Sequence, residues 1–253
     1  MTGRKLPQPD AHLPTIHDSR ALMLEDLVRL VEAAPVPPLT PDIARQATVV
    51  GNVLAKRTQR TRQVSFQYLH RLYGLDERTD AGQVFFRLFR NQPAARGQLA
   101  AVLGLQRDRL LRSSLPFILS FREGQMVEAA ALGTLLRESG ETFNDRTLGS
   151  VVQKLLLSWS QAGWVSSSLK KHRLAVEPLP ESVAFALFLG HQDGRRGLAL
   201  LDSLYMQAFA SSPDTLDELA YQASKLGYLS YRRIDDVLEI QFPQLQASAG
   251  QRV

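Results

Sequence analysis

Apolar residues recur every three or four positions through most of this chain, and prolines or short polar turns separate one such run from the next. This spacing places the apolar side chains on one face of an α-helix. Capping signals such as Thr40 before Pro41, and Gly74 after Tyr73, mark several boundaries. We therefore predict a mainly α fold, with helices over Ser19–Ala33, Pro41–Lys56, Arg60–Tyr73, Ala81–Asn91, Ala95–Leu103, Asp108–Phe121, Val127–Glu138, Asp145–Ala162, Glu181–Leu189, Leu198–Phe209 and Pro213–Leu226.

The order of elements after Gly124 is typical of a winged helix-turn-helix. A helix over Val127–Glu138 leads through a polar turn into a longer one, Asp145–Ala162, which Asn144 or Asp145 can cap. A serine- and lysine-rich segment, Trp164–Val176, follows in the place of the wing. In such a unit the second helix offers its N-terminal half to a DNA groove, and the wing touches the backbone.

A second passage has the same order and a clearer hairpin. The helical segments Leu198–Phe209 and Pro213–Leu226 precede Gly227 and two alternating runs, Tyr228–Arg233 and Val237–Phe242. The two passages are too different in sequence to be called a repeat, but their shared order predicts tandem winged-helix-like units with short β-hairpins.

A chain of 253 residues has room for one large domain or two to three small ones. The segment 1–18 carries three prolines and little periodicity, so it is either a loose arm or a strap packed on the body. We predict a flexible Pro-rich arm over 1–18, a basic helical bundle over 19–124, a winged-helix-like unit over 125–178, a second helical or winged-helix-like unit over 179–244, and a tail over 245–253.

Positive charge is concentrated in one part of the chain. The net charge is +5, but Gly51–Arg122 holds thirteen Lys and Arg residues against four acidic ones, which leaves −4 for the remainder. Such a distribution favours an anionic partner. Predicted contacts to double-stranded DNA are basic or small polar residues in three places: Lys56, Arg57, Arg60 and Arg62; Arg146, Thr147, Ser150, Lys154, Lys170, Lys171 and Arg173; and Arg232 and Arg233.

Each of these sets has a plainer alternative. The cluster from Lys56 to Arg62 at a helix junction suits a phosphate-binding site, but basic clusters are also common on solvated surfaces. Winged-helix units often serve as protein-binding modules, and the helix Pro213–Leu226 carries acids that repel phosphates. Trp159 and Trp164 are expected in the core and not as platforms for bases.

Several kinds of chemistry lack support in the sequence. There is no cysteine, the five histidines stand in no metal-ligand spacing, and no Gly-rich phosphate loop is present. Asp235 and Asp236 are adjacent in a turn and so point apart. We expect no catalytic centre, no metal, no cofactor and no membrane span. The absence of cysteine also fits a reducing cytoplasm.

Five parts of the chain form a recognisable series: Asn52–Thr58, Leu110–Arg112, Asn144–Leu157 with the following Gly-Trp step, Leu179-Pro180 with the apolar helix behind it, and Ala220–Arg233. Taken together, these passages resemble the BrxA-type component of BREX bacteriophage-defence systems. The resemblance covers about residues 20–242 and rests on hydrophobic patterns more than on a catalytic signature. It implies a DNA-binding accessory protein without enzymatic activity, beside a methyltransferase and other subunits.

The sequence thus predicts a non-enzymatic protein that binds duplex DNA mainly through phosphates. Few side chains on the outward face of Asp145–Ala162 can distinguish bases, so we expect steep salt dependence and little discrimination between sequences. Two alternatives stay open. One is an interaction scaffold within a multi-subunit defence complex, and the other is a transcriptional autoregulator.

Overall fold

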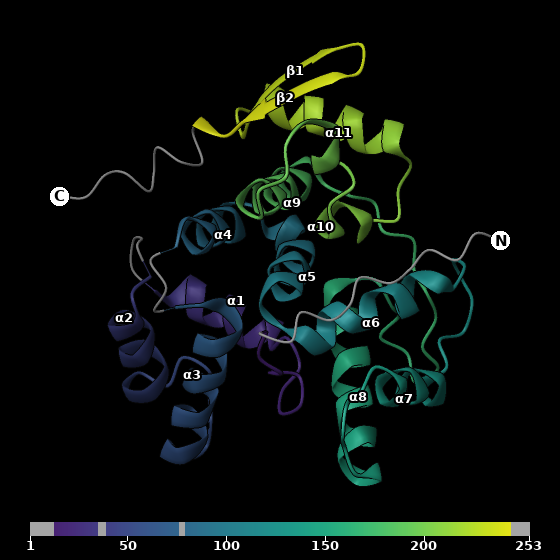
Figure 1. The fold of residues 1–253 in the computed structure, drawn as a ribbon. Helices are drawn as coiled ribbons and strands as arrows, with labels where there is room; N and C mark the ends of the chain where they lie inside the picture. Colours follow the sequence, from purple (N-terminus) through teal and green to yellow (C-terminus); the bar gives the residue numbers. More distant parts are fainter. Residues whose placement is uncertain (1–12, 35–38, 76–78, 244–253) are drawn as a thin grey trace.

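The computed structural model describes residues 13–34, 39–75 and 79–243. Most of these residues are helical, and the only named sheet among them is one antiparallel pair, which confirms the predicted mainly α fold (Figure 1). The α-helices are α1 (Leu24–Ala33), α2 (Pro41–Arg45), α3 (Gln59–Tyr73), α4 (Asp80–Asn91), α5 (Arg96–Arg107), α6 (Arg109–Ser120), α7 (Ala129–Glu138), α8 (Asp145–Ala162), α9 (Pro180–Gln192), α10 (Leu204–Gln207) and α11 (Pro213–Lys225); the strands are β1 (Ser230–Ile234) and β2 (Val237–Gln241).

Two helices form the centre of the structure. Residues Leu99–Leu105 of α5 and Ser182–Gly190 of α9 are buried without interruption, so each helix is covered on all sides. This agrees with their nearly continuous apolar sequence, since a helix that is apolar all round must lie in a core. Helix α5 packs on α3, α4, α6, α8 and α9, and one buried cluster extends from Ile16 to Phe242.

Three short strand-like segments pair with one another, one before α7 and two after α8. Backbone hydrogen bonds of 2.8 to 2.9 Å join segment 124–127 to segment 171–173, and bonds of the same length join 171–174 to 164–166. The isolated bridges there are antiparallel. Segments 164–166 and 171–174 therefore form a small hairpin directly after α8, and its second arm is central.

The last part of the described chain repeats this order. After α9, the short 3-10 turn Gly197–Leu200 packs on β2, α10 and α11 follow, and then comes the β1–β2 hairpin. Both α8 and α11 are followed by a glycine with positive φ, Gly163 at 96° and Gly227 at 81°. In both, the next residue donates its N–H to the carbonyl five positions back. The two units thus share an order of elements and a helix-ending motif.

The predicted start of the first helix at Ser19 is wrong, because α1 begins at Leu24. Residues 13–23 instead form a strap without regular secondary structure that packs on α6 and α8. Leu22 is buried, and its N–H donates to Oγ of Ser158 at 3.0 Å. The predicted arm is therefore a packed strap over residues 13–18, while residues 1–12 lie outside the described residues.

Two other predicted helices are shorter than expected. Helix α2 starts at Pro41 as predicted, but it continues only through a π-helical turn to Val50 and not to Lys56. Asn52 and Ala55 then have φ of 53° and 52°, and left-handed backbone cannot propagate a helix. Residues 198–209 break into the 3-10 turn and α10, because Ser203 caps a new helix start.

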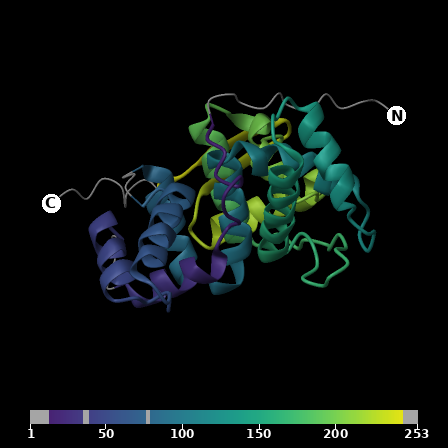
Figure 2. The same cartoon turned by 90° about the horizontal axis from the view of Figure 1, so that it is seen from below.

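The elements with predicted contacts lie at different ends of the structure. Figure 1 shows the β1–β2 hairpin at the top, over α11, and α3, α7 and α8 at the bottom. Figure 2, seen from below, again places α2 and α3 on one side and α7 and α8 on the other. No helix in the described part of the chain is long and apolar enough to cross a membrane. The division into domains stays a prediction.

Candidate nucleic-acid interface

Helix α8 carries the largest set of predicted contacts. Its bounds agree with the sequence prediction, because Oδ1 of Asn144 accepts the N–H of Thr147 at 2.9 Å and Gly163 ends the helix. The apolar stripe with Leu148 and Trp159 is buried, so the opposite face is open to solvent. Thr147 and Lys154 are half-buried at its edges, and the exposed positions are Asp145, Arg146, Gly149, Ser150, Gln153 and Leu157.

Charge on the first turn of α8 favours an anion. Asp145 is engaged in an ion pair with Arg137 of α7. Arg146 is exposed and has no ion pair within the part of the chain that the structure describes. The helix dipole adds partial positive charge at the same end. The first turn therefore has a free cation beside small polar side chains.

The turn of the small hairpin after α8 presents lysines on an ordered backbone. Oγ of Ser168 donates to the carbonyl of Lys170 at 2.6 Å, and Nζ of Lys171 donates to the carbonyl of Ser166 at 3.2 Å. Lys170 is exposed, and the side chain of Leu169 is 100% exposed beside it. Of the two predicted wing lysines, Lys170 thus projects from a turn that its own serines stabilise, whereas Lys171 is half-buried and folds back onto that turn.

Arg173 is predicted from the sequence as a phosphate contact of the wing, and its position does not support this. The residue is only 5% exposed, and its Nη1 donates to the carbonyls of Trp164 and Leu174. Burial lowers the pKa of Arg173, and the charge of Glu123 offsets this only partly. Arg173 lies in the central arm of the small sheet, so its guanidinium satisfies backbone carbonyls and is not accessible to DNA.

The basic cluster before α3 has both engaged and free members. Nζ of Lys56 forms an ion pair with Asp26 at 2.8 Å, and Nε of Arg62 donates to the carbonyl of Lys56 at 3.3 Å. Arg57 and Arg60 are exposed. Neither has an ion pair among the described residues, so these two arginines are the accessible cations of this cluster.

The second hairpin does not share a surface with the other candidates. Arg233 forms an ion pair with Asp217 of α11 at 2.6 Å, and the hydroxyl of Tyr231 donates to the same carboxylate at 2.7 Å. Arg232 is exposed, but the hairpin lies at the end opposite α3 and α8 (Figure 1). The structure does bring Lys56 and Lys154 together, because both line one groove.

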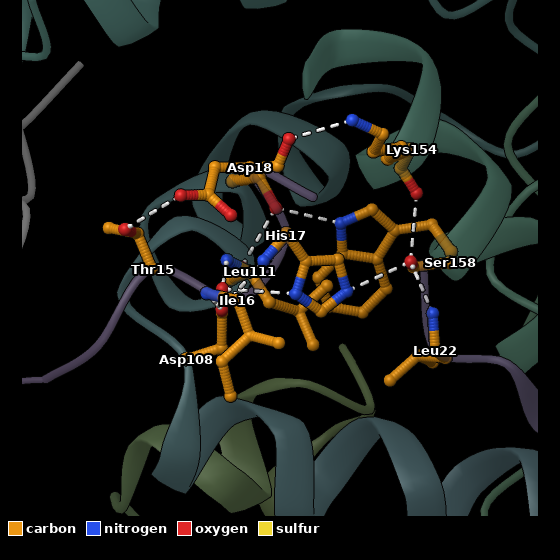
Figure 3. Close-up of polar contacts among 11 residues, drawn as sticks. Thr15, Ile16, His17, Asp18, Leu22, Asp108, Leu111, Lys154 and Ser158 are labelled. Atoms are coloured by element: carbon orange, nitrogen blue, oxygen red, sulfur yellow. Dashed lines mark hydrogen bonds and ion pairs between the residues drawn. The ribbon is translucent and has the colours of Figure 1, made fainter. Parts of the chain in front are cut away.

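A buried polar network joins the strap to two helices (Figure 3). Nδ1 of His17 lies 3.1 Å from Oδ1 of Asp108, and Nε2 lies 2.9 Å from Oγ of Ser158. All three residues are 0% exposed. Asp108 also accepts the backbone N–H groups of Ile16, His17 and Leu111, so it holds the strap and caps α6 together. We call His17, Asp108 and Ser158 the polar latch.

The polar latch has the residue types of a hydrolase triad, but its hydrogen bonds are those of a structural tie. Oγ of Ser158 donates its single hydrogen to the carbonyl of Lys154 at 2.8 Å and accepts the N–H of Leu22 at 3.0 Å. With its hydrogen engaged there, the same oxygen can only accept the hydrogen bond that it shares with Nε2 of His17. Because the hydroxyl is buried and its hydrogen is engaged with a carbonyl, it is not placed to attack a substrate.

The polar latch predicts an acid-sensitive contribution to stability. Burial is the largest influence on the pKa of Asp108 and would raise it, but His17 and the N–H groups of Leu111 and His17 together hold it below its ordinary value of 3.8. As pH falls, the unfolded chain therefore takes up this proton first, and folding loses stability. The contribution is complete above the ordinary pKa and disappears as pH falls through the folded one.

We expect the free energy of unfolding of the wild type to fall more steeply below about pH 4.5 than that of the Asp108→Asn variant. Urea unfolding at a series of pH values between about 2.5 and 6 measures both slopes. Parallel pH profiles for the two proteins would contradict the shifted pKa.

Sequence reasoning missed the polar latch and Arg20. The guanidinium of Arg20 is exposed on the strap and lies 4.8 Å from the ring centroid of Tyr68. The local signals are weak: a histidine in a Pro-containing segment, an aspartate before a helix, and a serine within one. Only the aspartate is informative alone, because Asp is a preferred N-cap.

The described residues contain no cluster of three or more His, Asp or Glu that could hold a metal ion. No protein-family model and no curated protein matches this chain.

Proposed function

We propose that this protein binds duplex DNA, mainly through phosphates, with the outward face of α8 and the following hairpin as the contact surface. The observation that carries the proposal is the set of free cations there: Arg146 on the first turn of α8 and Lys170 at the hairpin turn are exposed and lack carboxylate partners among the described residues. Phosphate contacts of this kind supply sequence-independent affinity.

The order of elements supports the same proposal. In a winged helix-turn-helix, a helix is followed by an outer strand-like segment, then by two helices across a turn, and then by a hairpin. This part of the chain has the same order, and the second arm of its hairpin pairs with the outer segment. In that architecture α8 would lie at a major groove. Ser150 and Gln153 are the exposed side chains able to reach base edges, so sequence discrimination would be slight.

The accessory role in a bacteriophage-defence system is part of this proposal and rests on the resemblance of the sequence alone. An interaction scaffold is a second candidate, which the charge of the last unit favours. Residues 179–243 contain nine acidic and five basic residues. The exposed face of α11 includes Asp214 and Glu218, which disfavour DNA there and suit a protein partner.

We expect replacement of Arg146, Lys170 and Lys171 by alanine to weaken binding to all duplexes alike, by roughly tenfold or more at low salt. The slope of log K against log salt should fall by about 1 for each phosphate that the variant no longer neutralises. Fluorescence anisotropy with duplexes of unrelated sequence, titrated across salt concentration, measures both quantities.

Lys225→Ala on α11 is the matched control, because it removes one exposed positive charge at a distant place and should leave binding unchanged. Failure of the wild type to bind any duplex at low salt would refute the proposal and promote the scaffold. Strong preference for one duplex would instead favour an autoregulator.

A further inference from the structure

A groove of about 380 Å³ lies between the strap, the first turn of α1 and α8. It brings together parts of the chain that are far apart in sequence: Arg20 from the strap, Lys56 from the segment before α3, and Lys154 from α8. Leu157, exposed on α8, also lines it, so the groove is continuous with the outward face of that helix.

Two of the three cations in this groove have no acidic partner among the described residues. Asp26 neutralises Lys56 at 2.8 Å, and Glu25, also at the groove, pairs with Arg29. Nζ of Lys154 donates to the carbonyl of Asp18 at 2.7 Å, and Nη1 of Arg20 donates to the carbonyl of Ser19 at 3.1 Å. Backbone carbonyls are neutral, so the charges of Arg20 and Lys154 remain uncompensated.

Both cations also keep unused donors. An ammonium group has three N–H donors and a guanidinium has five, and one of each is used in the bonds to the strap carbonyls. These bonds fix the two side chains in place before any ligand arrives. Fixed donors with net positive charge favour a group that carries several acceptor oxygens, such as a phosphate.

Gln161 also lines this groove, and it carries a polar atom without a partner. Its Oε1 is buried and has no hydrogen-bond partner among the described residues. A buried polar group without a hydrogen-bond partner lowers the stability of the fold, so a ligand or a solvent molecule that bonds to this amide would be favourable. A rotation of this half-buried side chain toward the groove would let its amide Nε2 donate to a phosphate oxygen.

We propose that this groove is a phosphate-binding subsite, in which Arg20 and Lys154 hold a phosphate of the DNA backbone and Gln161 donates to it. The inference rests on the proposed function and extends it. From Arg146 to Lys154, α8 rises about 12 Å, at about 1.5 Å per residue. A major groove is also about 12 Å wide, so a phosphate strand that borders it reaches this subsite.

Binding of a fluorescent duplex to the full chain tests this subsite. Arg20→Ala and Lys154→Gln should each weaken binding by roughly fivefold or more and lower the salt slope by about 1. Lys225→Ala on α11 is again the matched control, because it removes one exposed positive charge at a distant place; it should change affinity less than twofold. Circular dichroism spectra and thermal unfolding confirm that each variant is folded.

A second readout reports on the groove directly. In ¹⁵N-labelled wild type, the side-chain amide signals of Gln161 should move when duplex DNA is added, and Arg20→Ala should abolish the movement. Pyrophosphate in place of DNA tests whether a free phosphate compound also occupies the subsite. Movement with DNA but not with millimolar pyrophosphate assigns the subsite to the nucleic-acid backbone.

The outcomes separate this inference from the proposed function. If the wild type binds duplex DNA while both variants bind equally well and the Gln161 signals stay fixed, the subsite is refuted and the α8 surface stands. If the wild type binds no duplex, the proposed function fails. A pyrophosphate-induced shift of Gln161 that Arg20→Ala removes would then support a site for free phosphate compounds, and no shift would refute the subsite as well.

Discussion

The Asp108→Ala variant is expected to lose about 3–5 kcal/mol of its free energy of unfolding. Asp108 is a buried carboxylate that faces His17 and accepts three backbone N–H groups, two from the strap and one from α6. Truncation leaves these donors buried without an acceptor and removes the cap of α6. Urea unfolding followed by circular dichroism measures the shift of the midpoint.

Two further variants separate the parts of this effect. Asp108→Asn keeps an acceptor oxygen for the cap but loses the charge opposite His17, so its loss should be smaller. Ser158→Ala removes one hydroxyl and should cost about 1–3 kcal/mol, because the N–H of Leu22 and the ring of His17 lose their partner. A loss below about 0.5 kcal/mol for Asp108→Ala would show that the polar latch does not hold the strap.

The strap connects this stability to the proposed contact surface. Its Asp18 carbonyl fixes the ammonium of Lys154, and Arg20 forms one wall of the groove. The polar latch lies directly beneath these contacts (Figure 3). A variant that releases the strap is therefore expected to disturb the groove as well, while the exposed first turn of α8 stays in place.

Helices with both a strong apolar period and local end signals could be predicted from the sequence. Helix α8 has its stripe, Asn144 as cap and Gly163 as stop, and the structure has the predicted bounds. The bounds of α3 also agree with the prediction to within one residue, and Gly74 ends the helix as expected. Such signals act over a few residues, so they do not depend on the remainder of the fold.

Features that depend on distant contacts could not be predicted. The latch contact between His17 and Ser158 joins residues 141 positions apart, and it replaces the expected first turns of α1 by the strap. Arg173 has the sequence context of an exposed wing residue. Its burial follows from the pairing of its strand with residues 124–127, which makes that strand central. Likewise, only folding places Arg20 beside Lys154.

The Trp164→Ala variant is expected to lose about 3–5 kcal/mol of its free energy of unfolding. Trp164 is fully buried, as expected for a core residue, and its ring centroid lies 5.7 Å from that of Trp159 and 6.2 Å from that of Phe209. Its Nε1 donates to the carbonyl of Ala208 at 2.7 Å. The substitution creates a cavity and leaves that carbonyl without its donor.

Because Ala208 and Phe209 precede α11, this side chain joins the hairpin after α8 to the last unit. Trp164→Phe keeps most of the apolar packing and loses the hydrogen bond, so it should cost clearly less than Trp164→Ala. Equal losses of unfolding free energy in the two variants would mean that the hydrogen bond alone joins the hairpin to the last unit. An unchanged unfolding midpoint for Trp164→Ala would contradict the tight packing between these parts, which holds α8 and its hairpin in a fixed position relative to the core.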